Sequence, residues 1–206
     1  WVDPSKVYFS ARLSNERIET LETAQKLSNH LGRGLVVSDP YAGVGPSMGA
    51  LLNEPNLIRG YHAGDLNPDA VELLKTNLAH LSEKRKGVDG APAIHLDPST
   101  VVCKDATLWM KDEAFLQSCD LLLVNLPHDS IGHLPKVLPL LRREQTTVLR
   151  GWAIVQRDQQ GADQKRIQDA ITQAGGTIQS FKFDEVKGFS ASKSFMRFEV
   201  WMRLEV

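Results

Sequence analysis

A glycine-containing segment between a strand-like and a helix-like stretch is the part of this sequence best suited to chemistry. Residues 39–46, DPYAGVGP, follow the apolar run 35–37. Gly43 and Gly45 permit backbone conformations that a side chain forbids, so the chain can approach a nucleotide-like ligand closely. Asp65 ends a later strand-like stretch, which places a carboxylate to accept both hydroxyls of a ribose.

The spacing of the glycines narrows the class of ligand. Met48 stands where the third glycine of a dinucleotide-binding motif would be, so a pyrophosphate is not favoured. A nucleoside without phosphates, such as S-adenosylmethionine, fits the pattern better than the cofactor of a dinucleotide oxidoreductase does. The plainer alternative is that Gly43 and Gly45 only make a tight turn.

Strand-like and helix-like segments alternate along the chain, which predicts an α/β fold with a mostly parallel central sheet. Ser14 is expected to cap a first helix that ends at Gly32 or Gly34, and the polar stretch 82–99 is expected to be a surface loop. We expect strands at 35–38, 58–63, 101–103, 121–124 and 147–155, helices at 46–52, 68–81, 131–141 and 164–174, and antiparallel closing strands at 177–183 and 195–204.

Four polar residues, Asp39, Asp65, Asp105 and Asn125, each follow a predicted strand. Ligands of open parallel sheets bind beyond the carboxyl ends of the strands, so these side chains are expected to line one crevice. The Asn125 amide offers a donor and an acceptor that match the edge of a nucleobase. The alternatives are a helix cap or turn acid at Asp105, a loop aspartate at Asp65 and a strand-terminating Asn-Leu-Pro turn at Asn125.

Composition narrows the remaining classes of function. The chain has 206 residues, 42% of them hydrophobic, which is enough for a sizeable core. A net charge of −1 argues against a broadly basic nucleic-acid-binding surface. Cys103 and Cys119 lie in apolar contexts and predict buried thiols in a reducing compartment, and the scattered histidines predict no metal site. No apolar run reaches transmembrane length, so no membrane association is expected.

Several segments together resemble one known family. They are residues 6–17 (KVYFSARLSNER), 39–46, 64–71 (GDLNPDAV) and 125–127 (NLP), with a similar tail from 186–189 (VKGF) onward. They make the chain similar to the tRNA (guanine-37-N1) methyltransferases of archaea and eukaryotes, the Trm5 family. The resemblance implies a class I (Rossmann-like) S-adenosylmethionine-dependent methyltransferase that acts on N1 of guanine 37 in tRNA.

The resemblance also implies roles for individual residues. Asp65 would hold the ribose and Asp105 would face the adenine. Glu16 would take the proton from guanine N1, with Arg17 nearby, while Asn125 would hold the target guanine. The residues implied for the methyl donor are Tyr8, Asp39, Tyr41, Gly43, Gly45, Asp65, Leu66, Asn67, Asp105, Ala106 and Asn125; those implied for the tRNA substrate are Arg12, Asn125 and Pro127.

The chemistry expected of these residues is coherent. Guanine N1 is a poor nucleophile until a base removes its proton, and a carboxylate within hydrogen-bond reach supplies that base. A nearby cation or donor would stabilise the negative charge that builds on O6. Transfer from a sulfonium then needs alignment and no metal. The plainer reading of Glu16 and Arg17 is a charged first turn of a helix.

The expected organisation is an N-terminal segment and helix, 1–33, that carries the base and forms one compact unit with a methyltransferase domain, 34–206. The family's N-terminal RNA-binding module is not in this sequence, so we expect weak tRNA binding. Trp1 is not an initiator methionine, so we expect the chain to be a fragment of a longer protein, and we expect it to be a monomer. The expected compartment is the cytoplasm, with the nucleus or mitochondrial matrix open for a eukaryotic protein. Two alternatives remain: an aminocarboxypropyl transferase of the wybutosine pathway and a catalytically silent S-adenosylmethionine-binding module.

Overall fold

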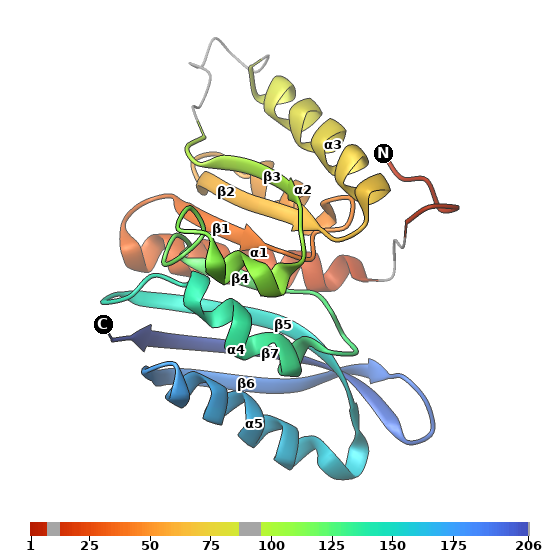
Figure 1. Ribbon diagram of the computed structural model, residues 1–206, viewed down its shortest axis with the longest axis vertical. Coiled ribbons are helices and arrows are strands. Elements are labelled where there is room, and N and C mark those ends of the chain that lie inside the picture. Colours follow the sequence, from red (N-terminus) through yellow and green to blue (C-terminus); the bar gives the residue numbers. More distant parts are fainter. Residues whose placement is uncertain (8–12, 87–95, 206) are drawn as a thin grey trace. The chain divides into compact units, whose positions relative to one another are not determined.

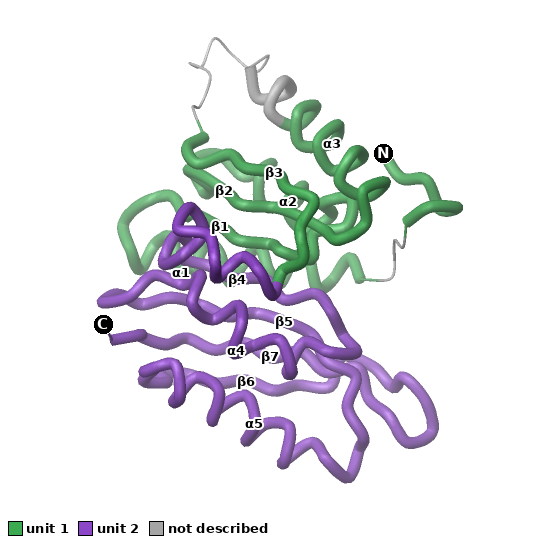
Figure 2. Tube along the Cα trace, in the orientation of Figure 1, with its two compact units in different colours: residues 1–106 green, residues 107–206 purple. Residues whose placement is uncertain are grey.

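The computed structural model describes residues 1–7, 13–86 and 96–205, with residues 82–86 described by their backbone alone. Two compact units make up the chain, Trp1–Ala106 and Thr107–Val206 (Figure 2). The single compact unit that the sequence predicts over 1–206 stays a prediction. Tyr8 and Arg12, two predicted binding residues, lie outside the described residues.

The first unit is a parallel sheet with helices. Strand β1 pairs with β2 and β2 pairs with β3, both in parallel, and α3 lies against β2 and β3 (Figure 1). Every residue of β1 is buried, as expected of a strand covered on both faces. Its elements are α1 (Ser14–Leu31), β1 (Leu35–Asp39), α2 (Pro46–Leu52), β2 (Ile58–Asp65), α3 (Pro68–Lys86) and β3 (Ser99–Cys103).

The second unit joins a parallel pair to an antiparallel hairpin. Strand β4 is parallel to β5, and β7 lies antiparallel between β5 and β6. The two units thus confirm an α/β fold of mostly parallel pairing that closes with antiparallel strands. After η2 (Ala106–Lys111), which begins at the end of the first unit, the elements are β4 (Leu121–Val124), α4 (Ser130–Val137), η3 (Leu138–Leu140), β5 (Thr146–Gln156), η4 (Arg157–Gln159), α5 (Gln160–Gln173), β6 (Gly176–Gly188) and β7 (Lys193–Leu204).

Two expected boundaries are wrong. The residue that caps α1 is Leu13, and the predicted cap Ser14 is already helical, although Gly32 ends the helix in the left-handed conformation as expected. The loop predicted over 82–99 is shorter than expected, because α3 continues to Lys86 and β3 begins at Ser99. Its first residues, SEKRK, include Lys, Glu and Arg, which favour helix as well as solvent.

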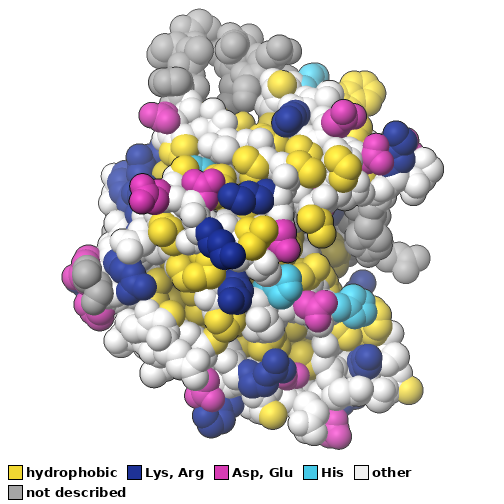
Figure 3. Space-filling view, in the orientation of Figure 1, with side chains coloured by type: hydrophobic (Ala, Val, Ile, Leu, Met, Phe, Trp, Pro, Cys, Tyr) yellow, Lys and Arg dark blue, Asp and Glu magenta, His cyan; other side chains and the backbone are white. Residues whose placement is uncertain are grey.

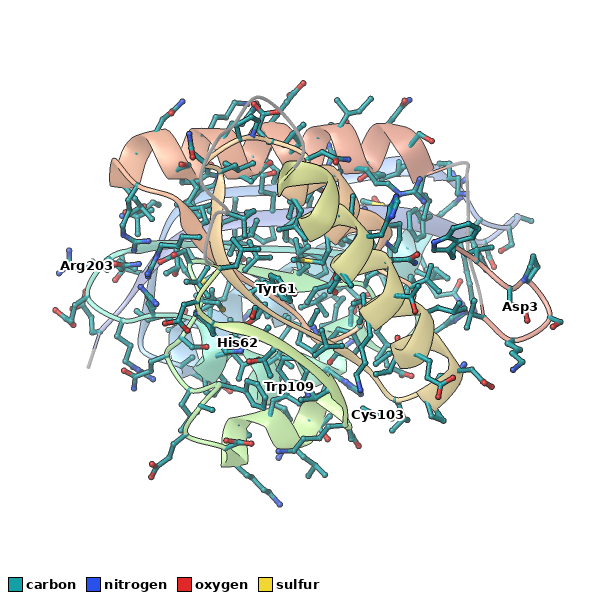
Figure 4. The ribbon with its side chains drawn as sticks, turned by 90° about the horizontal axis from the view of Figure 1, so that it is seen from above. Asp3, Tyr61, His62, Cys103, Trp109 and Arg203 are labelled. Atoms are coloured by element: carbon teal, nitrogen blue, oxygen red, sulfur yellow. The ribbon has the colours of Figure 1, made fainter. Side chains whose placement is uncertain are left out.

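The two cysteines differ in exposure. Cys119 is fully buried, as the sequence predicts, but Cys103 is exposed. Cys103 is the last residue of β3, and its label in Figure 4 marks that end of the strand. The prediction of two buried thiols is therefore wrong for Cys103, since a strand end is less covered than the middle of the strand.

A buried ion pair links two strands of the second unit. Arg150 on β5 stands opposite Glu199 on β7, and their side chains form a salt bridge with Arg150 only 1% exposed. The indole Nε1 of Trp201 donates to the other Glu199 oxygen at 3.1 Å. The Arg150 guanidinium also lies 5.7 Å from the ring centre of Trp152. Each partner thus compensates a charge whose burial alone would be costly.

Candidate functional site

The glycine turn after β1 has two glycines with different requirements. Gly43 and Gly45 have φ values of +55° and +83°, a region that favours glycine. A Cβ on Gly45 would lie 2.6 Å from Leu74 Cδ1, so α3 leaves no space for a side chain there. A Cβ on Gly43 would meet no atom within 4 Å. The backbone at Gly43 therefore borders open space that a ligand can approach.

The Asp65 carboxylate ties this turn to the end of β2. One oxygen, Oδ2, accepts a hydrogen bond from the Gly43 N–H at 2.9 Å, and Oδ1 accepts one from the Asn67 N–H at 2.9 Å. Each carboxylate oxygen can accept a second bond, and Asp65 is only partly buried. The carboxylate therefore fixes the turn and still has capacity for the hydroxyls of a ligand.

The side chain of Asn67 makes hydrogen bonds to backbone groups of two segments. Its side-chain Oδ1 accepts from the Asp69 N–H at 3.0 Å, and its Nδ2 donates to the Lys6 carbonyl at 3.1 Å. Asn67 thus caps α3, whose first residue is Pro68, and holds the N-terminal segment. An Asn before a Pro at a helix start is a sequence signal for this cap. Its predicted contact with a methyl donor stays a prediction.

Asp39, the last residue of β1, is a buried acid. It is 2% exposed, and among the described residues its Oδ1 has no hydrogen-bond partner. Burial raises the pKa of Asp39 to about 7, and the charge of Asp65 adds to the rise, against a backbone hydrogen bond from Tyr41. A buried carboxylate with one oxygen that lacks a hydrogen-bond partner favours a positive charge nearby.

Tyr41 and Asp105 belong to the same group of side chains. Burial raises the pKa of the half-buried Tyr41, and the negative charges of Asp105 and Asp39 raise it further. Asp105 lies between β3 and η2, next to the buried Ala106, while Leu66 is 71% exposed beside Asp65. The ends of all three strands of the first unit therefore contribute to one acidic group around the glycine turn.

The buried Asp39 should make stability depend on pH. Its pKa is 3.8 in an unfolded chain and about 7 in the fold. Between these values the folded state keeps a proton that the unfolded state has released, so the free energy of unfolding falls as the pH rises through this window, by at most about 1.4 kcal/mol per pH unit. In Asp39→Asn the decline should flatten, as measured by urea unfolding from pH 4.5 to 7.5. Equal slopes in both proteins would contradict it.

Glu16 and Arg17 lie at the start of α1. Glu16 is 5% exposed although it occupies the first helical turn, and its carbonyl accepts a hydrogen bond from Thr20 Oγ1 at 2.6 Å. Burial lowers the pKa of the partly buried Arg17. A merely solvated first turn would leave the acid exposed, so its burial favours a specific role for the Glu16 carboxylate.

In the second unit, Asn125 begins a well-ordered turn after β4. The Leu126 carbonyl accepts from the N–H groups of Asp129 and Ser130 at 3.0 and 2.7 Å, and the Pro127 carbonyl accepts from the Ile154 N–H at 2.7 Å. Asn125 and Pro127 are both half-buried. The predicted turn at the strand end is confirmed, and its role in holding guanine stays a prediction.

An aromatic pair beside this turn is missing from the sequence predictions. The rings of His128 and Phe189 meet edge to face, with their centres 6.0 Å apart and an angle of 82° between their planes. The sequence places Phe189 in the tail that resembles the family and His128 in a loop. Because 60 residues lie between the two, the sequence alone does not predict that their rings meet.

The surface is mixed in charge. On the face drawn in Figure 3, Lys and Arg side chains are interspersed with Asp and Glu side chains, in keeping with the net charge of −1. Among the described residues, none of the helices combines the length and apolar character needed to cross a bilayer. The same residues contain no group of three or more His, Cys, Asp or Glu side chains arranged to hold a metal ion.

The fold and the acid-bridged glycine turn define the chain as having the class I S-adenosylmethionine-dependent methyltransferase fold. The crystal structure of M. jannaschii TYW2 in complex with AdoMet superposes with a TM-score of 0.76 at 15% identity, covering 98% of this chain and 81% of that one. Wild-type Trm5b from Pyrococcus abyssi superposes with a TM-score of 0.71 at 21% identity, covering 100% of this chain and 52% of that one.

Sequence comparison gives the particular family. The chain is a relative of the tRNA (guanine(37)-N1)-methyltransferases, as its motifs predict. It is 41% identical over 78 residues to Trm5b of Methanocaldococcus jannaschii, which is 38% of this chain and 20% of that protein. It is 30% identical over 147 residues to tRNA (guanine(37)-N(1))-methyltransferase 1 of Vitis vinifera, which is 69% of this chain and 20% of that protein.

The matched segments cover a larger share of this chain than of its relatives. A third relative, from Puccinia graminis f. sp. tritici, is 35% identical over 141 residues, which is 64% of this chain and 24% of that protein. The chain thus spans about a fifth to a quarter of the length of the curated relatives it matches. No protein-family profile matches the chain.

Proposed function

We propose that this chain is a catalytic part of an enzyme that transfers a methyl group from S-adenosylmethionine to N1 of guanine 37 in tRNA. The observation that carries the proposal is the Asp65 carboxylate, which holds the Gly43 and Asn67 N–H groups and keeps capacity for a ribose. The names of the sequence relatives support the substrate, and they favour methyl transfer over the aminocarboxypropyl transfer that the sequence leaves as an alternative.

The described residues of the first unit fit this donor. Asp65 would accept hydrogen bonds from the ribose hydroxyls, and the open space at Gly43 would admit the nucleoside close to the backbone. The buried Asp39 carboxylate would add negative charge near the positively charged sulfur of the donor, and Asp105 would face the adenine. When bound, S-adenosylmethionine supplies a methyl group on a positively charged sulfur. Tyr41, Gly45, Leu66, Asn67 and Ala106 complete the proposed donor site within the first unit, and the contacts of Tyr8 and Asn125 with the donor stay predictions from the sequence.

In the proposed mechanism, a protein side chain removes the proton from guanine. Glu16 accepts the N1 proton of guanine, which turns N1 into a nucleophile. Asn125 presents its amide to the guanine edge, and Arg17 supplies positive charge for the developing charge on O6. Burial of Glu16 supports this role, since a side chain that is 5% exposed is held in one place rather than moving freely in solvent. Arg12 and Pro127 are the further substrate residues of the proposal.

The open space at Gly43 can be tested with a matched pair of variants. Gly43→Ala and Gly32→Ala both place a side chain at a positive φ with nothing within 4 Å, so each should cost about 1–2 kcal/mol of stability. Only Gly43→Ala should weaken S-adenosylmethionine binding, on the order of tenfold, because only its methyl group fills the space reserved for the nucleoside. Calorimetry and thermal unfolding separate the two effects. Equal affinities of the two variants would remove Gly43 from the donor site.

The reaction is tested by the product. Purified protein is incubated with S-adenosylmethionine and a tRNA that carries guanosine 37, and the digested nucleosides are resolved by mass. We expect 1-methylguanosine at position 37. A nucleoside carrying an aminocarboxypropyl group would favour the alternative transferase, and donor binding without turnover in any form of the protein would favour a silent binding module.

Binding of tRNA by these 206 residues alone should be weak. The charge is nearly balanced, and the solved complex of aTrm5 with tRNALeu contains a chain of which this one covers 49%. Gel shifts with tRNA should show a dissociation constant well above that of a longer form of the protein, if one is expressed, and sedimentation should show a monomer. Tight binding by residues 1–206 would contradict this expectation.

A further inference from the structure

An exposed aromatic ring stands at the tip of the β6–β7 hairpin. Phe189 is 50% exposed, and exposed His128 meets it edge to face at 6.0 Å. In an edge-to-face pair the ring that presents its edge leaves both of its faces uncovered by the other ring, and the ring that presents its face keeps the opposite face for stacking. Large aromatic surface left in water favours an interaction site.

The hairpin tip holds Phe189 in an ordered turn. The N–H groups of Phe189 and Ser190 both donate to the Lys193 carbonyl, at 2.9 and 3.0 Å, and the Lys193 N–H donates to Ser190 Oγ at 3.2 Å. The ring is therefore presented by a turn that closes on itself. A ring presented in this way loses little conformational entropy when a partner binds.

The end of β5 and the start of η4 anchor the loops that carry both rings. The Ile154 N–H donates to the Pro127 carbonyl at 2.7 Å, next to His128. The Arg157 N–H donates to the Ser192 carbonyl at 2.9 Å, in the hairpin tip. Because Ile154 and Arg157 are only three residues apart, the Asn-Leu-Pro turn and the hairpin tip are fixed to one short stretch of backbone.

The tip segment itself is basic, while Glu185 precedes it and Asp129 follows His128. Residues 186–194, VKGFSASKS, contain two lysines and no acid. Lys187 lies over the ring of Phe195, with Nζ 5.5 Å from its centre, and Arg157 approaches Glu185 at 3.5 Å. Lysines beside an exposed aromatic ring are the combination that single-stranded nucleic acid binds, with bases on the ring and phosphates on the cations.

We propose that His128 and Phe189 form a stacking platform for an unpaired nucleobase next to the target guanine of an RNA loop. The proposal rests on the proposed function, because Asn125, which would hold the guanine, begins the turn that ends in His128. A guanine taken out of its loop leaves a neighbour with one face unstacked, and the ring of Phe189 would cover that face. Phe189 and His128 thereby become determinants of the RNA substrate beyond the guanine itself.

The test uses the 206-residue chain and two anticodon stem-loop RNAs, with 2-aminopurine placed on either side of the target guanosine. Stacking on an aromatic ring quenches 2-aminopurine fluorescence. We expect quenching by the wild type at one of the two positions, its loss in Phe189→Leu, which keeps apolar bulk without the ring, and RNA affinity lower on the order of tenfold in that variant. His128→Ala should reduce the quenching, and Phe181→Leu, a ring change on β6 away from the tip, should leave it intact.

The outcomes separate this inference from the proposed function. Unchanged quenching in Phe189→Leu, or no quenching by the wild type at either position, overturns the platform. Self-association that Phe189→Leu abolishes, without change in RNA binding, also overturns it and assigns the ring to a protein contact. Calorimetry with S-adenosylmethionine and the mass-resolved product report separately on the proposed function, so a platform that fails leaves that result standing.

Discussion

Asp65→Asn should lower the affinity for S-adenosylmethionine by about a hundredfold or more. Two ribose hydroxyls would lose a charged acceptor, and each hydrogen bond to a charged group contributes about 1.5–3 kcal/mol. The amide has a second defect. Both carboxylate oxygens accept backbone N–H groups, from Gly43 and Asn67, so the new NH₂ must point at one of these donors. The turn therefore loosens as the ribose loses its partner.

Calorimetry measures this effect, at a temperature at which circular dichroism shows the variant folded. The matched control is Asp69→Asn, the same chemical change four residues further on, where the carboxylate contacts exposed Lys6 at 3.2 Å. The control should bind the donor as the wild type does. Donor affinity of Asp65→Asn within threefold of wild type would remove Asp65 from the ribose site.

Glu16→Gln should slow methyl transfer by about 10²- to 10⁴-fold, the range that a positioned general base contributes. Glutamine keeps the size and burial of the side chain but cannot take the N1 proton. Because the base acts only on guanine, donor affinity should stay close to the wild-type value. Single-turnover rates with saturating tRNA and donor isolate the chemical step from binding.

The control for this variant is Glu22→Gln on the same helix, at an exposed position. It should leave the single-turnover rate unchanged. Raising the pH of the assay should restore part of the Glu16→Gln rate, since guanine then loses its N1 proton to solvent. Equal loss of rate and donor affinity in Glu16→Gln would instead indicate a structural role for the buried carboxylate.

Local sequence signals predicted most of the fold. Buried parallel strands read as continuous apolar runs, and β4 occupies 121–124 as its Leu-Leu-Leu-Val predicts. The hairpin strands are longer than predicted, and β6 extends to Gly188. The end of this largely exposed strand has no sequence signal, because its residues are polar or exposed on both faces. The predicted end of α3 was wrong for a different reason, since charged residues suit both a loop and an exposed helix end.

The candidate site was predictable where it depends on strand ends, and not where it depends on pairing in space. Asp39, Asp65 and Asp105 come from the rule that parallel strands end at one edge. The hydrogen bond from the Gly43 N–H to Asp65, and the buried Asp39 oxygen that has no hydrogen-bond partner in the described part of the chain, both depend on the register of β1 against β2. The pair of His128 and Phe189 needs the β6–β7 hairpin to bring distant segments together.

The position of β7 has a consequence for synthesis on the ribosome. This strand comes last in chain order yet lies between β5 and β6, and it carries Glu199, the partner of Arg150. A nascent chain that has emerged only through β6 has neither the strand that joins β5 to β6 nor the anion that neutralises Arg150. The second unit must therefore wait, with a cation exposed on β5, until residue 199 has left the exit tunnel.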